Sequence, residues 1–384
     1  MLSLVRLSGV EVSDKSLKCD FVTAGTGLTV TETCLYSREF QSVGQTPDYI
    51  RAEFTAELQP GEGYTLDMLC DLKTDRDTYT EHGAVPDYGG LLSEHEAAWS
   101  SVWDRCDIAV PEDELQCALR YSMLQLMCNC SRNDPTVSIG ARGLTHGRYK
   151  GCYFWDTDMF MLPFFIENDM TAAKNLCLYR FGALAAAKKH AAEMNCRGAR
   201  YPWMAAFDGS EQCETWDIGC SELHISADVA YALDKYCTAS GDRDFYLDCA
   251  CEVYIETARF WISRYTYRPA SDTADLLFCK GPDEYCGVAN NNLYTNVMVK
   301  HNLHLAVEAA AELKEHRPAD YECLGVSEAE SRRWEHFKEI IKLPYDPDTG
   351  RLTTDDSFHL LEPVDISELK NGDEATYHKV CFDK

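Results

Sequence analysis

Helical segments separated by long loops fill most of this 384-residue chain, and this alternation constrains the fold more than any other feature. Helical patterns dominate from about residue 90 to about residue 342, and the three long loops cover residues 132–160, 196–220 and 268–293. Loops of this length are uncommon in a compact domain unless they carry function. The alternation therefore predicts a helical barrel or toroid with its functional site at one rim.

Several helix boundaries can be read from capping signals. Ser93-x-x-Glu96 and Ser327-x-x-Glu330 match the capping box, and Pro111 followed by three acidic residues favours a helix start. Apolar stripes are expected behind these starts, formed by Trp99, Val102 and Trp103, by Leu115, Leu119, Ser122 and Leu126, and by Trp334, Phe337 and Ile341. Further helices are expected over residues 171–194, 221–239 (ended by Ser240-Gly241), 242–264 and 295–314.

The first 75 residues have the alternation of strands instead. LTVTETCLY follows Gly25-Thr26-Gly27, and YTLDMLCDL follows Gly61-Glu62-Gly63, so each run is preceded by turn residues. This region predicts several antiparallel strands, too few for a complete sandwich.

Acidic residues outnumber basic ones by 63 to 36, which gives a formal net charge of −27. Nucleic acid and anionic lipid both need local positive charge on a protein, so this balance argues against either partner. An anionic substrate such as phosphate would need a local basic pocket. The N-terminus has no apolar stretch of signal-peptide length, and the apolar run of residues 159–166 is too short to span a bilayer. We therefore expect a cytoplasmic protein with a small or neutral partner.

The 19 cysteines show no metal-site spacing, because no two Cys-x-x-Cys pairs stand at zinc-ribbon distance. Cys128/Cys130 and Cys249/Cys251 lie inside apolar helical patterns. We interpret them as buried, reduced thiols that act as small hydrophobes, and we predict no bound metal. The odd number of cysteines also suits a reducing compartment.

The loop of residues 141–165 carries Phe154 and Trp155 directly before Asp156, with Asp158 two residues later. Sugar sites combine such groups, because aromatic faces cover the C–H patches of a pyranose and carboxylates accept hydrogen bonds from its hydroxyls. A core tryptophan beside a helix-capping aspartate accounts for this run equally well.

Two further loops carry similar groups. Residues 198–233 hold two tryptophans and several acids before a helix, which favours a second sugar subsite over a solvated acidic loop. In residues 280–296, Gly281-Pro282 fixes a turn before the adjacent acids Asp283 and Glu284. A glycosidase-type acid must be protonated near neutral pH, which requires a desolvated or like-charged setting, and Asp283 could supply part of that. Taken alone, such a pair is usually exposed charge, and lone histidines such as His146 and His224 are usually structural.

Together the three loops resemble glycoside hydrolase family 65, the inverting phosphorylases that act on kojibiose, nigerose, maltose or trehalose. The resemblance covers roughly residues 75–384 and rests on RYKGCYFWDTDMFMLPFF, GARYPW with SELHISADVAYA, and GPDEY with NNNLYTN. It implies a mainly α fold, an incomplete (α/α)6 barrel preceded by part of an antiparallel β-sandwich and a linker helix. The implied boundaries are 1–75 for the sandwich strands, 76–110 for the linker and 111–384 for the barrel.

The resemblance also implies a mechanism. Glu284 falls on the family's general acid, which protonates the glycosidic oxygen while inorganic phosphate attacks the anomeric carbon from the opposite face. The products would be β-D-glucose 1-phosphate and a released sugar, with no cofactor and no second catalytic carboxylate. The residues expected to bind substrate are Trp155, Asp156, Arg142, Trp203, Glu222, His224 and Asp283.

Two other functions stay open, an inverting hydrolase of the acid trehalase type and an inactive sugar-binding fragment. The chain ends at HKVCFDK, before the family's Lys-Gln-Ala-Asp motif and its phosphate-binding Ser/His segment. It is therefore expected to be a fragment, poorly active alone, of an enzyme that forms a homodimer when full length. CETWDIG and EYCGVANNN lean slightly toward the kojibiose or nigerose type.

Overall fold

The computed structural model describes residues 5–46, 49–78, 87–144 and 147–361, without the side chains of Trp216, Asp217 and Tyr285. The chain forms two compact units, Met1–Asp107 and Ile108–Lys384. None of the described helices is both long and apolar enough to cross a membrane. His146 lies outside the described residues.

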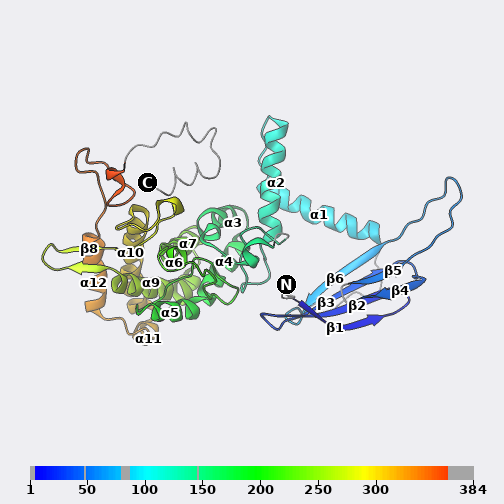
Figure 1. Cartoon of the computed structure of the whole chain (residues 1–384), viewed down its shortest axis with the longest axis horizontal. Coiled ribbons are helices and arrows are strands. Elements are labelled where there is room, and N and C mark those ends of the chain that lie inside the picture. Colours follow the sequence, from blue (N-terminus) through cyan, green and yellow to red (C-terminus); the bar gives the residue numbers. More distant parts are fainter. Residues whose placement is uncertain (1–4, 47–48, 79–86, 145–146, 362–384) are drawn as a thin grey trace. The chain divides into compact units, whose positions relative to one another are not determined.

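The first unit is built on a four-stranded antiparallel sheet in the order β1-β2-β3-β6 (Figure 1). The predicted strand in LTVTETCLY is confirmed as β3, and the one in YTLDMLCDL as β6. A separate hairpin joins β4 to β5. The strands are β1 (Val5–Val12), β2 (Ser16–Thr23), β3 (Thr29–Tyr36), β4 (Ser42–Gln45), β5 (Ile50–Glu53) and β6 (Met68–Thr74).

The unit ends in helix α1 (Tyr88–Cys106), whose predicted start at Ser93 is wrong. Asp87 caps the helix instead, since its side chain accepts a hydrogen bond from the backbone N–H of Gly90 at 2.7 Å. Ser93 lies in the second turn and donates its hydroxyl to the carbonyl of Gly89. The helix therefore starts at the cap formed by Asp87 and not at the capping box of Ser93 and Glu96.

Among the described residues of the second unit, the regular structure is helical apart from one short hairpin, β7 (Thr266–Arg268) with β8 (Thr273–Asp275). Its longer helices are α2 (Asp113–Asn129), α3 (Leu162–Asn168), α4 (Met170–Gly182), α5 (Leu184–Glu193), α7 (Ile225–Ser240), α9 (Cys251–Arg264), α10 (Leu293–His316) and α12 (Glu328–Ile340). Short helical turns are η1 (Arg148–Gly151), α6 (Trp216–Gly219), α8 (Arg243–Phe245), η4 (Glu284–Cys286), α11 (Pro318–Cys323) and η5 (Phe358–Leu360), and π-helical turns are η2 (Thr157–Met161) and η3 (Tyr246–Ala250).

Two predicted helices differ in detail from the structure. The helix expected over residues 171–194 is interrupted at Ala183, between α4 and α5. The helix expected from residue 221 begins only at Ile225, because residues 221 and 222 pair with the backbone of Lys280. Its end is as predicted, with Gly241 in the left-handed conformation that stops a helix (φ 64°).

The core of this unit lies among α7, α9, α10 and α12. The predicted stripe of Trp334, Phe337 and Ile341 is confirmed, because all three side chains are buried. Ser327 caps α12 as predicted, accepting from the backbone N–H of Glu330 at 3.1 Å. Trp261 is fully buried and donates its indole N–H to the Asn302 side chain at 3.0 Å, which satisfies the polar atom of a large apolar group.

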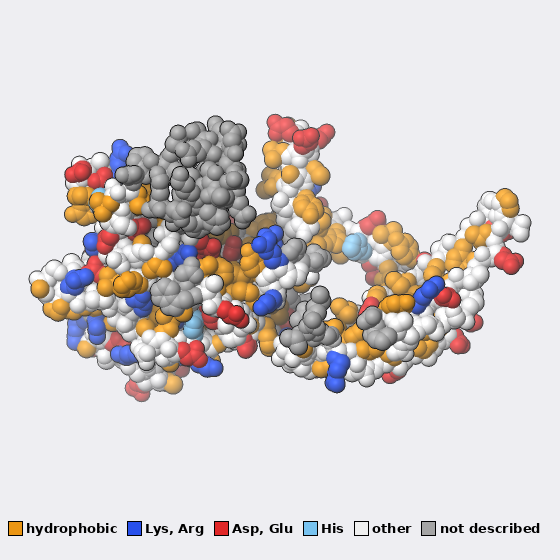
Figure 2. Space-filling model, in the orientation of Figure 1, with side chains coloured by type: hydrophobic (Ala, Val, Ile, Leu, Met, Phe, Trp, Pro, Cys, Tyr) orange, Lys and Arg blue, Asp and Glu red, His pale blue; other side chains and the backbone are white. Residues whose placement is uncertain are grey.

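The stripe expected on helix α2 is buried only in part. Leu115 is 52% exposed and Ser122 is exposed, whereas Leu126 packs against the core and Met123 is buried, so packing begins in the C-terminal half of the helix. Figure 2 shows apolar side chains along α2 and acidic side chains at its tip. Cys128 is likewise exposed, so its predicted burial is wrong, while Cys249 and Cys251 are buried as predicted.

The second long loop is fixed at its start by contact with α9. Gly198 has a positive φ of 72°, and the next residue donates its backbone N–H to the carbonyl of Glu256 at 2.9 Å. A Cβ at Gly198 would lie 2.1 Å from that carbonyl oxygen and 2.5 Å from the backbone nitrogen of Phe260. Only glycine fits this position, because both obstacles are backbone atoms of a buried helix.

We expect Gly198→Ala to lower the free energy of unfolding by about 3 kcal/mol, through backbone overlap and an unfavourable φ. Gly182→Ala is the matched control, because a Cβ there meets nothing within 4 Å at the end of α4. It should change stability by less than about 1 kcal/mol. Urea unfolding followed by circular dichroism measures both. Equal stability of the two variants would contradict the close approach at Gly198.

Candidate active site

Three loops that are distant in sequence meet at one cluster of side chains, in which Glu222 and His224 are buried and Trp155 and Tyr294 are partly buried. Trp155 precedes η2, Glu222 and His224 precede α7, and Tyr294 lies in the first turn of α10. The ring centroids of Trp155 and His224 are 4.7 Å apart, those of His224 and Tyr294 5.4 Å, and those of Trp155 and Tyr294 6.1 Å. The structure therefore brings together Trp155, Glu222 and His224, which the sequence predicted as substrate-binding residues.

His224 is the centre of a charged hydrogen-bond network. Its Nδ1 lies 2.5 Å from Asp228 Oδ2 and its Nε2 lies 3.2 Å from Glu222 Oε1. Tyr294 donates its hydroxyl to Asp228 Oδ1 at 2.8 Å. Burial by itself lowers the pKa of His224, but Asp228 and then Glu222 outweigh it and raise that pKa to about 9. The ring is therefore an imidazolium at neutral pH, with both nitrogens donating.

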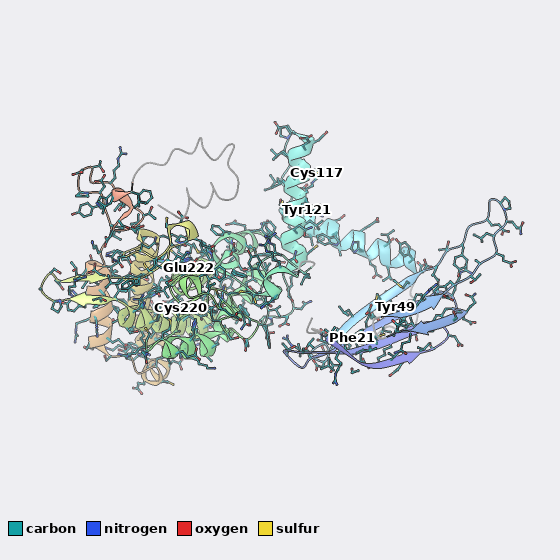
Figure 3. All side chains as sticks on the ribbon, viewed as in Figure 1. Phe21, Tyr49, Cys117, Tyr121, Cys220 and Glu222 are labelled. Carbon is teal, nitrogen blue, oxygen red and sulfur yellow. The ribbon has the colours of Figure 1, made fainter. Side chains whose placement is uncertain are left out.

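One carboxylate oxygen of Glu222 accepts a hydrogen bond, and the other has no partner among the described residues. Its side chain is 1% exposed, Oε1 accepts from His224, and Oε2 has no hydrogen-bond partner among the described residues. Figure 3 shows Glu222 among the helices of the second unit. An unpaired buried carboxylate oxygen is costly, because the group has lost water without gaining a donor. A ligand hydroxyl is the kind of donor that would satisfy it.

The loop that carries Glu284 starts beside Glu222. Lys280 donates its backbone N–H to the carbonyl of Ser221 at 2.8 Å, in a parallel bridge between Glu222 and Lys280. A Cβ on Gly281 would lie 2.2 Å from the Asn292 side-chain nitrogen. The buried Asn292 caps α10 by accepting from the backbone N–H of Thr295 at 3.0 Å. This explains why Gly281 stands at the start of the loop and Asn292 at its end.

Asp283 and Glu284 themselves are exposed. Glu284 begins the turn η4, and Asp283 Oδ2 accepts from the Cys286 thiol at 3.1 Å. The desolvated setting that an acid needs is therefore not provided by the described residues around Glu284. Its assignment as the acid stays a prediction.

Arg142 and Trp203 are linked to Trp155 through its neighbour Phe154. The exposed Arg142 guanidinium lies 5.9 Å from the Tyr149 ring centroid, and the Tyr149 and Phe154 centroids are 5.3 Å apart. Phe154 packs edge-on against Trp203 at 5.0 Å, and Trp203 Nε1 is buried without a described partner. Asp156 is exposed beside Trp155.

Asp158 does not serve the site as the sequence suggested. It is buried and binds Arg180 in a two-point contact, with Nε at 3.0 Å from Oδ1 and a terminal nitrogen at 2.5 Å from Oδ2. Both carboxylate oxygens are occupied, so its role is to anchor the Trp155 loop to α4. Conversely, sequence reasoning missed Asp228 and Tyr294. Asp228 lies four residues after His224, a spacing that places both on one helical face and could have revealed the pair.

The chain is similar in sequence to members of one enzyme family. Residues 120–383 match the family model of the glycosyl hydrolase family 65 central catalytic domain. The chain is 39% identical over 273 residues to kojibiose phosphorylase from Caldanaerobacter subterraneus subsp. tengcongensis, an alignment that covers 67% of this chain and 35% of the relative. It is 33% identical over 340 residues to alpha,alpha-trehalose phosphorylase from Thermoanaerobacter brockii, covering 84% of this chain and 44% of the relative. The chain thus spans less than half the length of these relatives.

A solved structure provisionally assigned as a kojibiose phosphorylase from the human microbiome has the same fold. The TM-score is 0.83 at 22% identity, and the match covers 97% of this chain and 51% of the other. The predicted fold class, part of an (α/α)6 barrel preceded by antiparallel strands and a helix, is confirmed by this match.

The charge on His224 predicts a pH dependence of stability. Its pKa rises from an unfolded value of about 6.5 to about 9 in the fold, so the native state holds the proton more tightly. The stabilisation is complete below about pH 6.5 and is lost as the pH rises through 9. Asp228→Asn should flatten this decline, because Asp228 is the main group that raises the pKa of His224.

Urea unfolding at several pH values between about 6.5 and 9.5 measures the slope. His304→Gln is the control, since His304 is exposed and pairs only across one helical turn with Glu308. It should keep the wild-type slope. Equal slopes for wild type and Asp228→Asn would show that His224 is neutral in the fold.

Proposed function

Because the chain belongs to glycoside hydrolase family 65, we propose that it carries the acid and the sugar-binding part of an enzyme that phosphorolyses an α-linked glucose disaccharide with inversion. The observation that carries the proposal is the cluster of the partly buried Trp155 with the buried Glu222 and His224, directly beside the backbone of the Glu284 loop. The relatives named above are phosphorylases of kojibiose and of trehalose, which supports phosphate as the acceptor.

The cluster has the chemistry of a glucose subsite. The Trp155 ring offers an apolar surface to pyranose C–H groups, and Oε2 of Glu222 offers an acceptor to a hydroxyl. Glu222 accepts from a charged imidazole, which orients the carboxylate and offsets its buried charge. Asp228 and Tyr294 act on the sugar only through His224, so they are positioning residues.

In the proposed mechanism Glu284 is a general acid. It gives its proton to the glycosidic oxygen as the bond to the anomeric carbon breaks, and the released sugar leaves with that proton. A phosphate oxygen forms the new bond from the opposite face, which yields β-D-glucose 1-phosphate. Glu284 is exposed in the described chain, so its protonation requires that bound disaccharide exclude water from this loop.

The assignments of Arg142, Asp156, Trp203 and Asp283 to substrate binding belong to the same proposal. Asp156 and Asp283 are exposed neighbours of Trp155 and Glu284, while Arg142 and Trp203 flank the Phe154 side of the site. A homodimer, a cytoplasmic location and a reaction without a cofactor remain family-based predictions. The alternative is an inverting hydrolase, in which a base-activated water replaces phosphate.

We expect Glu284→Gln to lower kcat on the disaccharide by about 10³-fold with little change in KM, because an amide cannot donate the proton. The measurement uses a chain extended to the length of the relatives. With α-D-glucosyl fluoride and phosphate, the variant should approach wild-type turnover, since fluoride leaves without protonation. Glu335→Gln, which removes an exposed carboxylate on α12, is the control and should retain both activities.

Two outcomes would remove Glu284 from this role. Unchanged turnover of the disaccharide is one. An equal loss with disaccharide and fluoride is the other, because it would point to misplacement of the loop instead of loss of a proton.

A second assay tests phosphate itself. Kojibiose, nigerose, maltose and trehalose are each incubated with the extended protein, with and without phosphate. We expect glucose 1-phosphate to form only with phosphate, most rapidly from kojibiose or nigerose. Release of free glucose alone, at the same rate without phosphate, would establish the hydrolase.

A further inference from the structure

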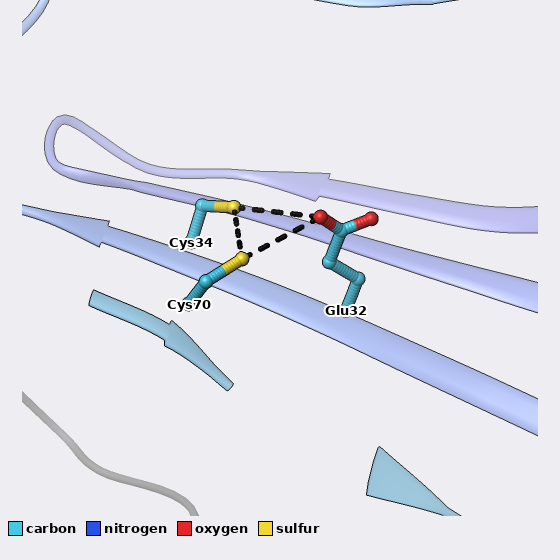
Figure 4. A group of neighbouring side chains, drawn as sticks. All are labelled: Glu32, Cys34 and Cys70. Carbon is cyan, nitrogen blue, oxygen red and sulfur yellow. Dashed lines mark hydrogen bonds between the residues drawn. The ribbon is translucent and has the colours of Figure 1, made fainter. Parts of the chain in front are cut away.

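A second cluster of reactive side chains lies on the sheet of the first unit. Cys34 Sγ is 3.2 Å from Cys70 Sγ, and Glu32 Oε1 is 3.9 Å from the first sulfur and 3.5 Å from the second (Figure 4). Cys70 is exposed, and Glu32 and Cys34 are partly buried. The three ligand atoms lie within 4.8 Å of one another.

Strand register brings these residues together. Cys34 on β3 and Cys70 on β6 are direct cross-strand partners, and Glu32 precedes Cys34 by two residues on the same face. Cys19 stands opposite Glu32 on β2. A cavity of about 300 Å³ opens over this face, lined by Cys19, Glu32, Cys34 and, from the β4–β5 hairpin, Tyr49. Figure 3 shows Tyr49 and Phe21, which also lines the cavity, in the sheet unit. The cluster is therefore reachable from solvent.

The three ligand atoms crowd around one point on the sheet. Two thiolates and a carboxylate around one point repel strongly, and a divalent cation at that point converts the repulsion into attraction.

We propose that Glu32, Cys34 and Cys70 bind a thiophilic divalent cation, with Zn²⁺ as the natural fit. Sulfur ligands about 2.3 Å and an oxygen about 2.1 Å from Zn²⁺ place tetrahedral ligand atoms about 3.6–3.8 Å apart. The two sulfur–oxygen distances, 3.5 and 3.9 Å, lie within about 0.3 Å of this geometry, and the sulfurs need to separate by about half an ångström, which rotation of the exposed Cys70 side chain could supply. Both thiols release their protons on binding, and a water completes the tetrahedron.

A cross-strand disulfide explains the cluster less well. The sulfurs are 3.2 Å apart, well beyond the bonded distance of about 2.05 Å. The Glu32 carboxylate takes no part in a disulfide bond, whereas carboxylates are common ligands of Zn²⁺.

The test titrates Co²⁺, a spectroscopic substitute for Zn²⁺, into the reduced, metal-free chain of 384 residues. We expect one equivalent to produce thiolate-to-cobalt charge-transfer absorption in the near ultraviolet and the visible bands of tetrahedral Co²⁺. Zn²⁺ should displace it, and binding should release two protons in weakly buffered solution. Cys34→Ser with Cys70→Ser should lose this equivalent, and Glu32→Gln should weaken it at least about tenfold, as does the loss of other groups that support a metal site.

Cys117→Ser is the matched control, because Cys117 is an exposed thiol on α2, in the other unit. It should bind Co²⁺ as the wild type does. Glu32→Gln leaves both thiols in place. If the double variant does not fold, the Co²⁺ affinity of Glu32→Gln still tests the proposed site. The proposal is overturned if the reduced chain takes up no Co²⁺, if the double serine variant binds it equally well, or if Glu32→Gln leaves the affinity unchanged. A Cys34–Cys70 disulfide found by peptide mass spectrometry, in protein that takes up no metal once reduced, would establish the redox pair instead.

Discussion

The charged imidazole of His224 holds the candidate active site together, because it is the group on which three separate loops converge. It binds Asp228 on one nitrogen and Glu222 on the other, while Trp155 and Tyr294 pack their rings edge-on against it. One buried positive charge thus lies between two acidic side chains and gives each of them a hydrogen-bond donor. Without that donor, Glu222 would have no hydrogen-bond partner from the ring on either carboxylate oxygen.

Backbone contacts also connect the loop of Glu222 to the loop of Glu284 and to α10. The bridge between Glu222 and Lys280 fixes the start of the Glu284 loop, and the close approach of Gly281 to Asn292 fixes that loop to the beginning of α10. Glu222 is rigid because its surroundings are packed, whereas Glu284 stands on an exposed turn. In the proposed mechanism, the site would therefore combine a preorganised sugar-binding surface at Glu222 with an acid, Glu284, whose surroundings change when substrate binds.

Sequence reasoning succeeded where the determining interactions are local. Ser327 caps α12 and Gly241 ends α7, because both signals act within one helical turn. It failed where a distant partner decides. The sequence left open whether the run with Asp158 serves a sugar site or the core, and the ion pair with Arg180, twenty-two residues away, decides for the core. Helix α7 starts later than predicted because residues 221 and 222 pair with Lys280. The ligands Cys34 and Cys70 are thirty-six residues apart, so no spacing motif could have revealed them.

The charge around the site bears directly on the choice between phosphate and water. His224, the exposed Arg142 and the buried Lys280 are three cations at the site. They face five acids, namely the buried Glu222 and Asp228 and the exposed Asp156, Asp283 and Glu284. This negative balance suits a neutral glucosyl unit, whose hydroxyls need acceptors, but it repels a phosphate dianion. Phosphate binding thus requires cationic groups placed on the face of the sugar opposite Glu284, where they would draw the anion in line with the breaking bond. A hydrolase needs a single base at that position, so the charge there is the physical difference between the two reactions.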